Sequence, residues 1–323
     1  MYLELFLLLV GFAVLIQGTF FLVEGASSLA KIFNIPTVVI GFTIVAFGTS
    51  MPELVVTLYA TQKGYHELAF ANVIGSNIFN LLFVLGLSAL IYPLIVLRNT
   101  IKVEIPLSLL AAIILYILVN DKVLRLHEYD QLDRTDAVIL LAICSFFILY
   151  ILRTLRSAGD YEETPVKLES TPVATGSILL GLALLAGGSF LVVDNVVTLA
   201  EHFALPQSFA GLTVLAIGTS LPELFTAVVA ASRRNTDIVI GNVIGANIFN
   251  ILFTLAVAAL VRPLTYSALL NTDIEVLVLS NIILIVFMFT IHHRKLDRLE
   301  ACLMIIAYLV FLLFHVVKNL QWT

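Results

Sequence analysis

The stretch Gly41-Phe-Thr-Ile-Val-Ala-Phe-Gly-Thr-Ser-Met-Pro-Glu-Leu54 returns later in the chain as Gly211-Leu-Thr-Val-Leu-Ala-Ile-Gly-Thr-Ser-Leu-Pro-Glu-Leu224. The two stretches are identical at nine of fourteen positions and lie 170 residues apart. Each places a Gly-Thr-Ser-x-Pro-Glu hexad inside an otherwise apolar segment. A carboxylate in such a segment is costly, and it indicates a functional site. We therefore expect the molecule to be organised around Glu53 and Glu223.

The composition indicates an integral membrane protein. The chain has 323 residues, of which 60% are hydrophobic and 12% charged, and its mean hydropathy is +1.07. Soluble domains carry about 25% charged residues. The apolar runs are continuous and about 20 residues long, which predicts membrane-spanning helices rather than the alternating strands of a barrel. The net charge of -5 and the lack of a basic patch give no indication of nucleic acid as a partner.

The hydropathy pattern predicts ten spans. They are Leu3–Val23, Thr37–Thr61, Leu68–Tyr92, Val103–Val119, Ala137–Leu155, Gly176–Ala200, Gln207–Ser232, Ile238–Val261, Ile274–Ile291 and Ala301–Val317. The longest connection, 156–175, is polar and is predicted to be a linker between a first five-helix repeat, 1–155, and a second, 176–323. It is too short to hold a regulatory domain.

A second pair of segments keeps the same spacing. Ala71-Asn-Val-Ile-Gly-Ser-Asn-Ile-Phe-Asn-Leu-Leu-Phe83 aligns with Gly241-Asn-Val-Ile-Gly-Ala-Asn-Ile-Phe-Asn-Ile-Leu-Phe253 at ten of thirteen positions. Because each half holds an odd number of spans, the second half must enter the membrane from the opposite side. The predicted fold is all-α, with ten transmembrane helices as two inverted five-helix repeats. This architecture is typical of secondary transporters, which bind substrate near the midplane, where the repeats meet.

The distribution of Lys and Arg predicts the orientation. The loops after spans one, three, five, seven and nine hold eleven of the seventeen basic residues, and the side with both termini holds six. Cytoplasmic loops carry the excess of Lys and Arg. We therefore expect both termini outside and the 156–175 linker in the cytoplasm.

Each hexad gathers oxygen ligands on one helix face. Thr49, Ser50 and Glu53 are three or four residues apart, so their side chains can share a face; Thr219, Ser220 and Glu223 repeat the pattern. Proline removes a backbone donor and clashes with the carbonyl four residues earlier. We expect this to turn carbonyls away from the helix ladder, between Ala46 and Thr49 and between Ala216 and Thr219. The alternative is that proline and glycine only kink these helices.

The second repeated segment adds a hydroxyl and amides. Ser76 and Asn80 are four residues apart, and Asn250 corresponds to Asn80. We expect Asn80 and Asn250 to line the site. For Asn77 and Asn247, a direct role and a role as hydrogen-bonding glue between helices both remain open.

The pooled ligands are all oxygens. Such a set suits hard cations and not zinc, copper or iron. Two carboxylates carry a charge that one Ca²⁺ or several Na⁺ can neutralise, whereas Mg²⁺ gives up its water reluctantly.

Two further patterns have more than one interpretation. Gly11, Gly18 and Gly25 recur every seven residues, and this stripe serves either a helix that slides over the core or tight static packing. The six histidines lie near predicted membrane edges and are interpreted as interfacial, with a role in proton coupling as the alternative; they are His66, His127, His202, His292, His293 and His315.

These hexads, with the Gly-Ser-Asn-Ile-Phe-Asn stretch, resemble the two alpha repeats of the sodium/calcium exchanger branch of the calcium:cation antiporters. The resemblance covers nearly the whole chain. It implies exchange of Na⁺ for Ca²⁺ by alternating access, with the first and sixth helices sliding across the bundle. By position it implies that Glu53 and Glu223 are the central cation-binding acids. The other implied ligands are Thr49, Ser50, Thr219, Ser220, Ser76, Asn80 and Asn250, with the backbone carbonyls of Ala46 and Ala216.

The sequence departs from the family pattern at two positions. Ala246 stands where related exchangers often carry serine, so one Na⁺ site loses a hydroxyl. Asn250 stands where some relatives, including potassium-dependent ones, have aspartate, which argues against K⁺ co-transport. The Gly-Asn-x-x-Glu-His type of motif found in the calcium/proton branch is absent from the sequence.

We therefore expect a Na⁺/Ca²⁺ antiporter of the prokaryotic minimal type in the inner (plasma) membrane. Ca²⁺ and Na⁺ are its substrates, lipid surrounds it, and neither a cofactor nor an obligatory protein partner is implied. The alternatives are a Ca²⁺/H⁺ exchanger on the same fold and a passive cation channel. An enzyme is disfavoured, because the cluster offers no histidine base.

Overall fold

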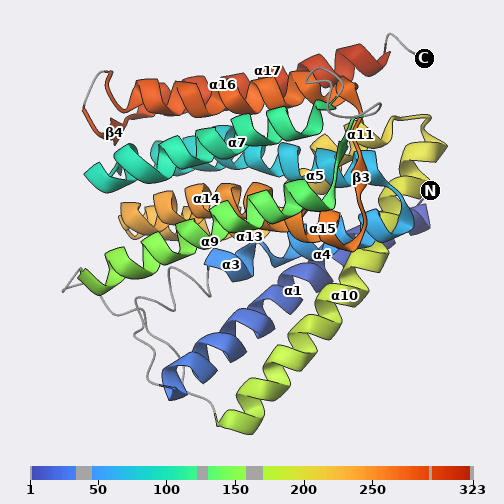
Figure 1. Cartoon of the computed structure of the whole chain (residues 1–323), viewed down its shortest axis with the longest axis horizontal. Helices are drawn as coiled ribbons and strands as arrows, with labels where there is room; N and C mark the ends of the chain where they lie inside the picture. Colours follow the sequence, from blue (N-terminus) through green and yellow to red (C-terminus); the bar gives the residue numbers. More distant parts are fainter. Residues whose placement is uncertain (1, 34–45, 122–129, 158–169, 291–292, 321–323) are drawn as a thin grey trace.

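The computed structural model describes residues 2–33, 46–121, 130–157, 170–290 and 293–320, and within them the chain is almost wholly helical (Figure 1). The first half contains α1 (Tyr2–Ile32), α3 (Ala46–Thr49), α4 (Met51–Lys63), α5 (His66–Ile78), η2 (Phe79–Val84), α6 (Leu85–Ile91), β1 (Leu94–Ile95), η3 (Thr100–Glu104), α7 (Ile105–Val119), β2 (Gln131–Leu132) and α9 (Arg134–Ser157). The second half contains α10 (Thr171–His202), α11 (Gln207–Ala210), η4 (Gly211–Leu215), α12 (Ala216–Thr219), α13 (Leu221–Ser232), α14 (Thr236–Phe249), η5 (Asn250–Leu255), α15 (Ala256–Val261), β3 (Leu264–Thr265), η6 (Ala268–Leu270), α16 (Asn271–Phe287), β4 (Lys295–Leu296) and α17 (Arg298–Leu320).

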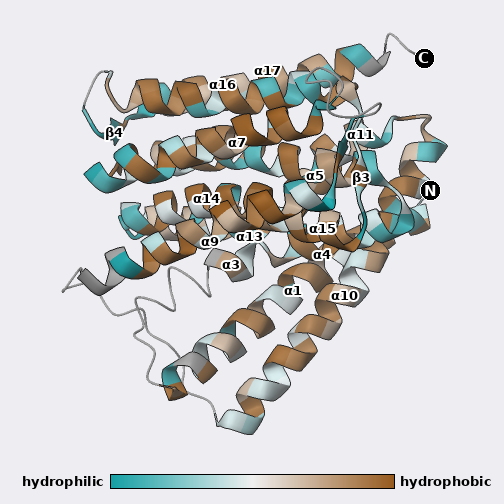
Figure 2. Ribbon diagram, in the orientation of Figure 1, coloured by the Kyte–Doolittle hydropathy of each residue, from teal (hydrophilic) through white to brown (hydrophobic). Residues whose placement is uncertain are grey.

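The protein is an all-α membrane protein. Within the described ranges, eight helices are long and apolar enough to cross a membrane, and the bent pair Gln207–Thr219 and Leu221–Ser232 makes a ninth span. Apolar residues run along the long helices, while hydrophilic residues gather near helix ends and connections (Figure 2). These nine spans correspond to nine of the ten predicted ones. The remaining prediction, Thr37–Thr61, lies partly outside the described residues, and α3 and α4 are its described part.

The helix boundaries correct the expected linker. α9 continues to Ser157 and α10 already begins at Thr171, so both ends of the predicted 156–175 connection are helical. Pro172 lies in the first turn of α10, where a missing N–H costs nothing because that donor has no partner inside the helix. The rest of this connection lies outside the described residues.

Short strands pair reciprocally between the halves. β1 pairs with β4, and β2 pairs with β3, both antiparallel. β1 and β3 occupy equivalent positions after α6 and α15, so the two pairs exchange under a twofold rotation. β3 and β4 lie at opposite ends of the long helices (Figure 1). Because β1 pairs with β4, the equivalent strands β1 and β3 also lie at opposite ends. This arrangement is that of inverted repeats.

The central helices are the repeated ones. In the apolar stretches of His66–Ile91 and Thr236–Val261, 78% of the residues are buried. In the other single spans the buried share is 22–39%. α5 with η2, and α14 with η5, therefore form the middle of the bundle. The broken helices α3–α4 and α12–α13 pack against them.

α1 and α10 run side by side, at an angle to the rest of the bundle (Figure 1). Their glycines face each other: a Cβ on Gly18 would lie 3.0 Å from the carbonyl oxygen of Gly181, and one on Gly25 would lie 2.6 Å from that of Ala174. The glycine stripe therefore serves tight packing of α1 against α10, a contact that fits both static packing and a pair of helices that slides as one. A sliding movement would carry both helices together.

Candidate functional site

Both hexads break their helices at the serine. α3 ends at Thr49, Ser50 adopts φ -84 and ψ 6, and α4 begins at Met51 with its proline in the first turn. Ser220 adopts φ -86 and ψ 10 at the equivalent break. The break puts each glutamate in the first turn of the following helix, where the helix dipole favours negative charge.

The two carboxylates are fully buried and each is held by the other half of the molecule. Glu53 and Glu223 have 0% exposure. The hydroxyl of Ser220 donates to Oε1 of Glu53 at 2.8 Å, and the hydroxyl of Ser50 donates to Oε1 of Glu223 at 3.1 Å. The site therefore exists only where the two halves meet, as the repeat pattern predicts.

Further hydroxyls flank the carboxylates. Those of Thr219 and Ser76 lie beside Glu53, and the hydroxyl of Thr49 lies beside Glu223. Hydroxyl and carboxylate oxygens from α3, α4, α5, α12 and α13 thus surround a single centre of negative charge.

Amides complete the centre. Asn80 lies in η2 and Asn250 begins η5, and both are fully buried. These segments are π-helical, a distortion that is frequent at functional sites because it disturbs the regular carbonyl ladder. Asn77 and Asn247 lie one turn earlier and are equally buried.

Four buried acceptor oxygens on the carboxylates and amides of this centre have no hydrogen-bond donor among the described residues. They are Oε2 of Glu53, Oε2 of Glu223, Oδ1 of Asn80 and Oδ1 of Asn250. Each unpaired buried polar atom costs about 1–3 kcal/mol, and more for a charged group. Together they cost roughly as much as the whole stability of a typical domain. A cation would remove this cost, because it binds acceptors and needs no donors.

The chemistry of this centre excludes several metals. Within the described ranges, no group of three or more His, Cys, Asp or Glu side chains could hold a metal ion. Soft or tetrahedral sites use Cys and His, whereas hard cations accept carboxylate, amide and hydroxyl oxygens. The donor set suits Ca²⁺ and Na⁺.

The backbone carbonyls behave differently from the prediction. The carbonyl of Ala216 stays in the helix ladder and accepts the Ser220 N–H at 3.2 Å; it also accepts the Ser76 hydroxyl at 3.3 Å. The donor that Pro222 removes belongs to the carbonyl four residues earlier, at Gly218, so Ala216 keeps its partner. In the other half, Ala46 is the first residue of α3.

Sequence reasoning missed Asn72 and Asn242. The Thr219 hydroxyl lies 3.2 Å from Oδ1 of Asn72, and the Thr49 hydroxyl lies 3.3 Å from Oδ1 of Asn242. Both amides are therefore attached to the threonines that border the carboxylates. The available signal was their place in the repeated thirteen-residue segment, where both are retained.

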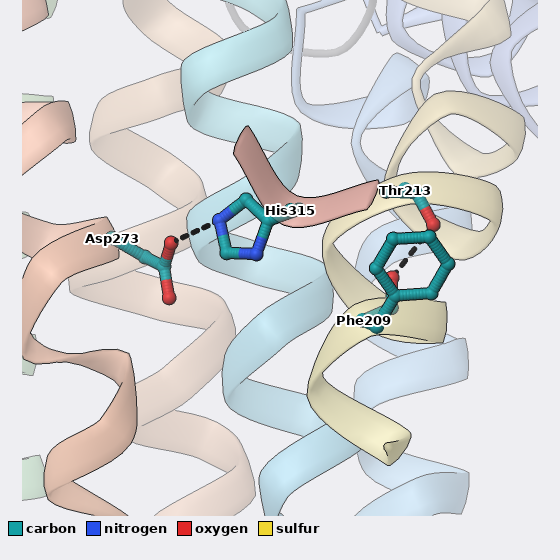
Figure 3. Close-up of polar contacts among 4 residues, drawn as sticks. All are labelled: Phe209, Thr213, Asp273 and His315. Carbon is teal, nitrogen blue, oxygen red and sulfur yellow. Dashed lines mark hydrogen bonds and ion pairs between the residues drawn. The ribbon is translucent and has the colours of Figure 1, made fainter. Parts of the chain in front are cut away.

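One histidine contradicts the interfacial interpretation. His315 of α17 is buried, and its Nε2 lies 2.7 Å from Oδ1 of Asp273 at the start of α16 (Figure 3). Figure 3 also shows Thr213 of η4, whose hydroxyl donates to the Phe209 carbonyl at 2.6 Å. The His315 pair joins α16 to α17 and is separate from the hexads.

Comparisons with known proteins identify relatives along nearly the whole chain. A family model described as sodium/calcium exchanger protein matches residues 3–154 and 173–317. The inner membrane protein YrbG of Escherichia coli (strain K12) is 38% identical over 291 residues, covering 86% of each chain. The putative antiporter CaxA of Alkalimonas amylolytica is 35% identical over 312 residues, covering 93% of this chain and 95% of its own.

A solved structure has the same fold. It is that of the sodium-calcium exchanger NCX_Mj soaked with 2.5 mM Na⁺ and 10 mM Sr²⁺. The TM-score is 0.66 at 31% sequence identity, and the match covers 96% of this chain and 97% of the other.

Proposed function

The chain belongs to the sodium/calcium exchanger family, and we propose that it exchanges Na⁺ for Ca²⁺ across a membrane by alternating access. The relatives whose names state an activity are a putative antiporter and sodium/calcium exchangers, which are transporters and not enzymes. The observation that carries the proposal is the set of four unpartnered acceptor oxygens on Glu53, Glu223, Asn80 and Asn250. They are buried where the two repeats meet, as expected for a transported cation.

The proposed ligand set is the one implied by the sequence. The two carboxylates bind either one Ca²⁺ or several Na⁺, because either load neutralises both charges. Oxygen ligation by carboxylates, amides and hydroxyls is what Ca²⁺ prefers. The proposed ligands are Glu53, Glu223, Thr49, Thr219, Ser50, Ser220, Ser76, Asn80 and Asn250, with the carbonyls of Ala46 and Ala216. The ions are cargo, and the mechanism requires no cofactor.

Burial explains why transport would be coupled. An unloaded site leaves two uncompensated carboxylates in a region of low dielectric, at a cost of several kcal/mol per ion. Such a site resists the closed intermediate through which the protein must pass. Only loaded sites then cross, so that one ion species moves in as the other moves out.

The α1–α10 pair is the proposed moving part. Two of its side chains lie against the hexads: Phe12 packs on Gly218, and Val23 packs on Gly48. A shift of the tightly packed pair along the bundle would therefore open or close access to the centre. For orientation we propose both termini outside, the connection between α9 and α10 in the cytoplasm, and the inner membrane as location. The start of α1 and the end of α17 lie at the same end of the molecule (Figure 1), which supports the placement of both termini on one side of the membrane.

The test is Ca²⁺ uptake into proteoliposomes loaded with Na⁺ and diluted into Na⁺-free buffer, beside K⁺-loaded and acid-loaded vesicles. Uptake that requires internal Na⁺ is the expected result. Uptake driven by the proton gradient alone would replace Na⁺ by H⁺ as the counter-ion. Uptake without any opposing gradient would indicate a channel and overturn the proposal of antiport.

A further inference from the structure

Four asparagines connect the two central helices in a closed, reciprocal network. Nδ2 of Asn77 donates to the Asn247 carbonyl at 3.3 Å, and Nδ2 of Asn247 donates to the Asn77 carbonyl at 3.0 Å. Nδ2 of Asn80 donates to Oδ1 of Asn247, and Nδ2 of Asn250 donates to Oδ1 of Asn77, both at 3.1 Å. All four side chains have 0% exposure.

The network gives the four amides two different roles. In Asn77 and Asn247, both the side-chain oxygen Oδ1 and the amino group Nδ2 are hydrogen-bonded to protein partners. Asn80 and Asn250 use only the amino group, and each keeps an unpartnered Oδ1 among the described residues. One pair is therefore occupied by the network, and the other pair presents an acceptor.

The network also decides which end of Asn80 and Asn250 faces the centre. A side-chain amide has an acceptor end and a donor end, and rotation by half a turn exchanges them. If the Asn80 amide turned, its oxygen would meet Oδ1 of Asn247, which is an acceptor too. Its amino group would then face the centre, where a cation would be repelled. The same argument holds for Asn250 and Asn77.

We propose that Asn77 and Asn247 are positioning residues for the transported cation. They do not touch the ion. Each holds the amino group of an asparagine from the other repeat, so that the oxygen of Asn250 or Asn80 faces the ion. This proposal deepens the proposed function and rests on it. It differs from both interpretations that the sequence left open for this pair, a direct role at the ion and a purely structural bond between helices.

A purely structural role predicts something different. If these amides only join α5 to α14, their removal would lower thermal stability. Ca²⁺ affinity would then fall in proportion to the lost stability, whichever residue stands at position 80 or 250. A positioning role predicts that the loss of affinity depends on the chemistry of the ligand that is positioned. A carboxylate at that place has acceptors at both ends, so it needs no orientation.

The experiment is a double-mutant cycle with Asn247→Ala and Asn80→Asp, using the purified full chain. Ca²⁺ dissociation constants and thermal midpoints are measured for each variant. Asn247→Ala should weaken Ca²⁺ binding about 10-fold, as is usual when a group that orients a ligand is lost. In the Asn80→Asp background the same substitution should weaken Ca²⁺ binding less than about 2-fold. The difference between the two backgrounds would then be about 5-fold, which lies in the range of coupling energies measured for interacting residues.

The equivalent cycle, Asn77→Ala with Asn250→Asp, tests the other side and serves if one variant does not fold. Asn120→Ala is the matched control: this amide at the end of α7 exchanges hydrogen bonds with the amide of Asn271 on α16, at 3.1 and 2.8 Å, and bonds to none of the proposed ligands, so its loss should leave Ca²⁺ affinity unchanged. An equal loss of affinity in both backgrounds would overturn the positioning role. If the unmodified chain binds no Ca²⁺, the proposed function itself fails, and the two failures are distinguishable.

Discussion

The two halves present the same carboxylates with unequal sets of hydroxyls. Glu53 is bordered by the hydroxyls of Ser220, Thr219 and Ser76, whereas Ala246 occupies the position equivalent to Ser76 in the other half. The bonds between the serines and the glutamates, by contrast, are reciprocal. The symmetric elements carry the charge that a divalent ion needs. The asymmetric ones only add neutral oxygens, which implies one shared Ca²⁺ position and Na⁺ positions of unequal quality.

The inequality extends to the side chains behind the site. Nδ2 of Asn72 donates to the Thr57 hydroxyl at 3.1 Å, but Ala227 replaces that threonine in the second half, and Nδ2 of Asn242 donates to the Glu223 carbonyl at 3.2 Å instead. The repeats have thus diverged at two neutral hydroxyls, those of Ser76 and Thr57, and have stayed equal at both carboxylates.

The largest expected effect belongs to the symmetric charge. Glu53→Gln and Glu223→Gln should each lower Ca²⁺ exchange by about 100-fold or more, because a buried divalent ion loses one of two counter-charges. The measurement is Na⁺-driven Ca²⁺ uptake in proteoliposomes, with Glu67→Gln in the first turn of α5 as control. A loss confined to one of the two glutamates would contradict the shared position.

The next effect concerns the contact of α1 with each hexad. A Cβ on Gly218 would lie 2.0 Å from the Phe12 ring, and one on Gly48 would lie 2.2 Å from a methyl group of Val23. Gly218→Ala should reduce stability by about 1–3 kcal/mol, as overpacking does. Gly48→Ala should cost less, because a single methyl group moves aside more easily than a ring.

Thermal unfolding of both glycine variants measures this difference. Adding Phe12→Leu to Gly218→Ala should restore most of the lost stability, because the ring is the obstacle. If the added substitution gives no recovery, α1 does not seat on the hexad as described.

A smaller effect should follow the unequal hydroxyls. Ser76→Ala should raise the Na⁺ concentration for half-maximal exchange several-fold while changing Ca²⁺ affinity less, because Ca²⁺ keeps both carboxylates. Ala246→Ser should lower the Na⁺ concentration for half-maximal exchange, since it adds a hydroxyl at the position equivalent to Ser76. The combined variant moves the hydroxyl from one half to the other and should exchange near the original Na⁺ concentration. Equal shifts for both ions would show that Na⁺ and Ca²⁺ use this hydroxyl alike.

The smallest effect concerns a bond that only one half can form. The Tyr59 hydroxyl of α4 lies 3.1 Å from both carboxylate oxygens of Asp194 on α10, whereas Val229 is the residue equivalent to Tyr59. Tyr59→Phe should shift the balance between the two facing states a few-fold, by removing about 0.5–1.5 kcal/mol at most from the state with this bond. Apparent Ca²⁺ affinities measured from the two membrane sides report the shift. Tyr59→Phe should leave their ratio unchanged if the bond survives in both states.

The sequence was most informative where chemistry and burial conflict. A glutamate beside proline in an apolar run has few explanations, so Glu53 and Glu223 could be found without coordinates, and the repeat spacing predicted that the halves would meet there. Helix ends were harder to predict: the segment after Val23 is rich in small residues, and nothing in it stops α1 before Ile32.

The sequence could not predict which distant side chains contact each other. Asn72 and Asn77 lie five residues apart on one helix, and only their contacts across the bundle separate a residue that holds a threonine from one that holds another amide. His315 carries no local mark of its partner Asp273, forty-two residues away. The glycine stripe was visible, but the partner helix that it faces was not. In each case the missing information was a tertiary distance.

The central claim is that the two carboxylates hold either Ca²⁺ or Na⁺. Equilibrium binding of radioactive Ca²⁺ to the purified chain, titrated with Na⁺ at constant ionic strength and pH, tests it directly. We expect complete displacement of Ca²⁺, with a Hill coefficient above one because several Na⁺ replace one Ca²⁺. Bound Ca²⁺ that persists at saturating Na⁺ would contradict the account, since both ions would then occupy the protein together.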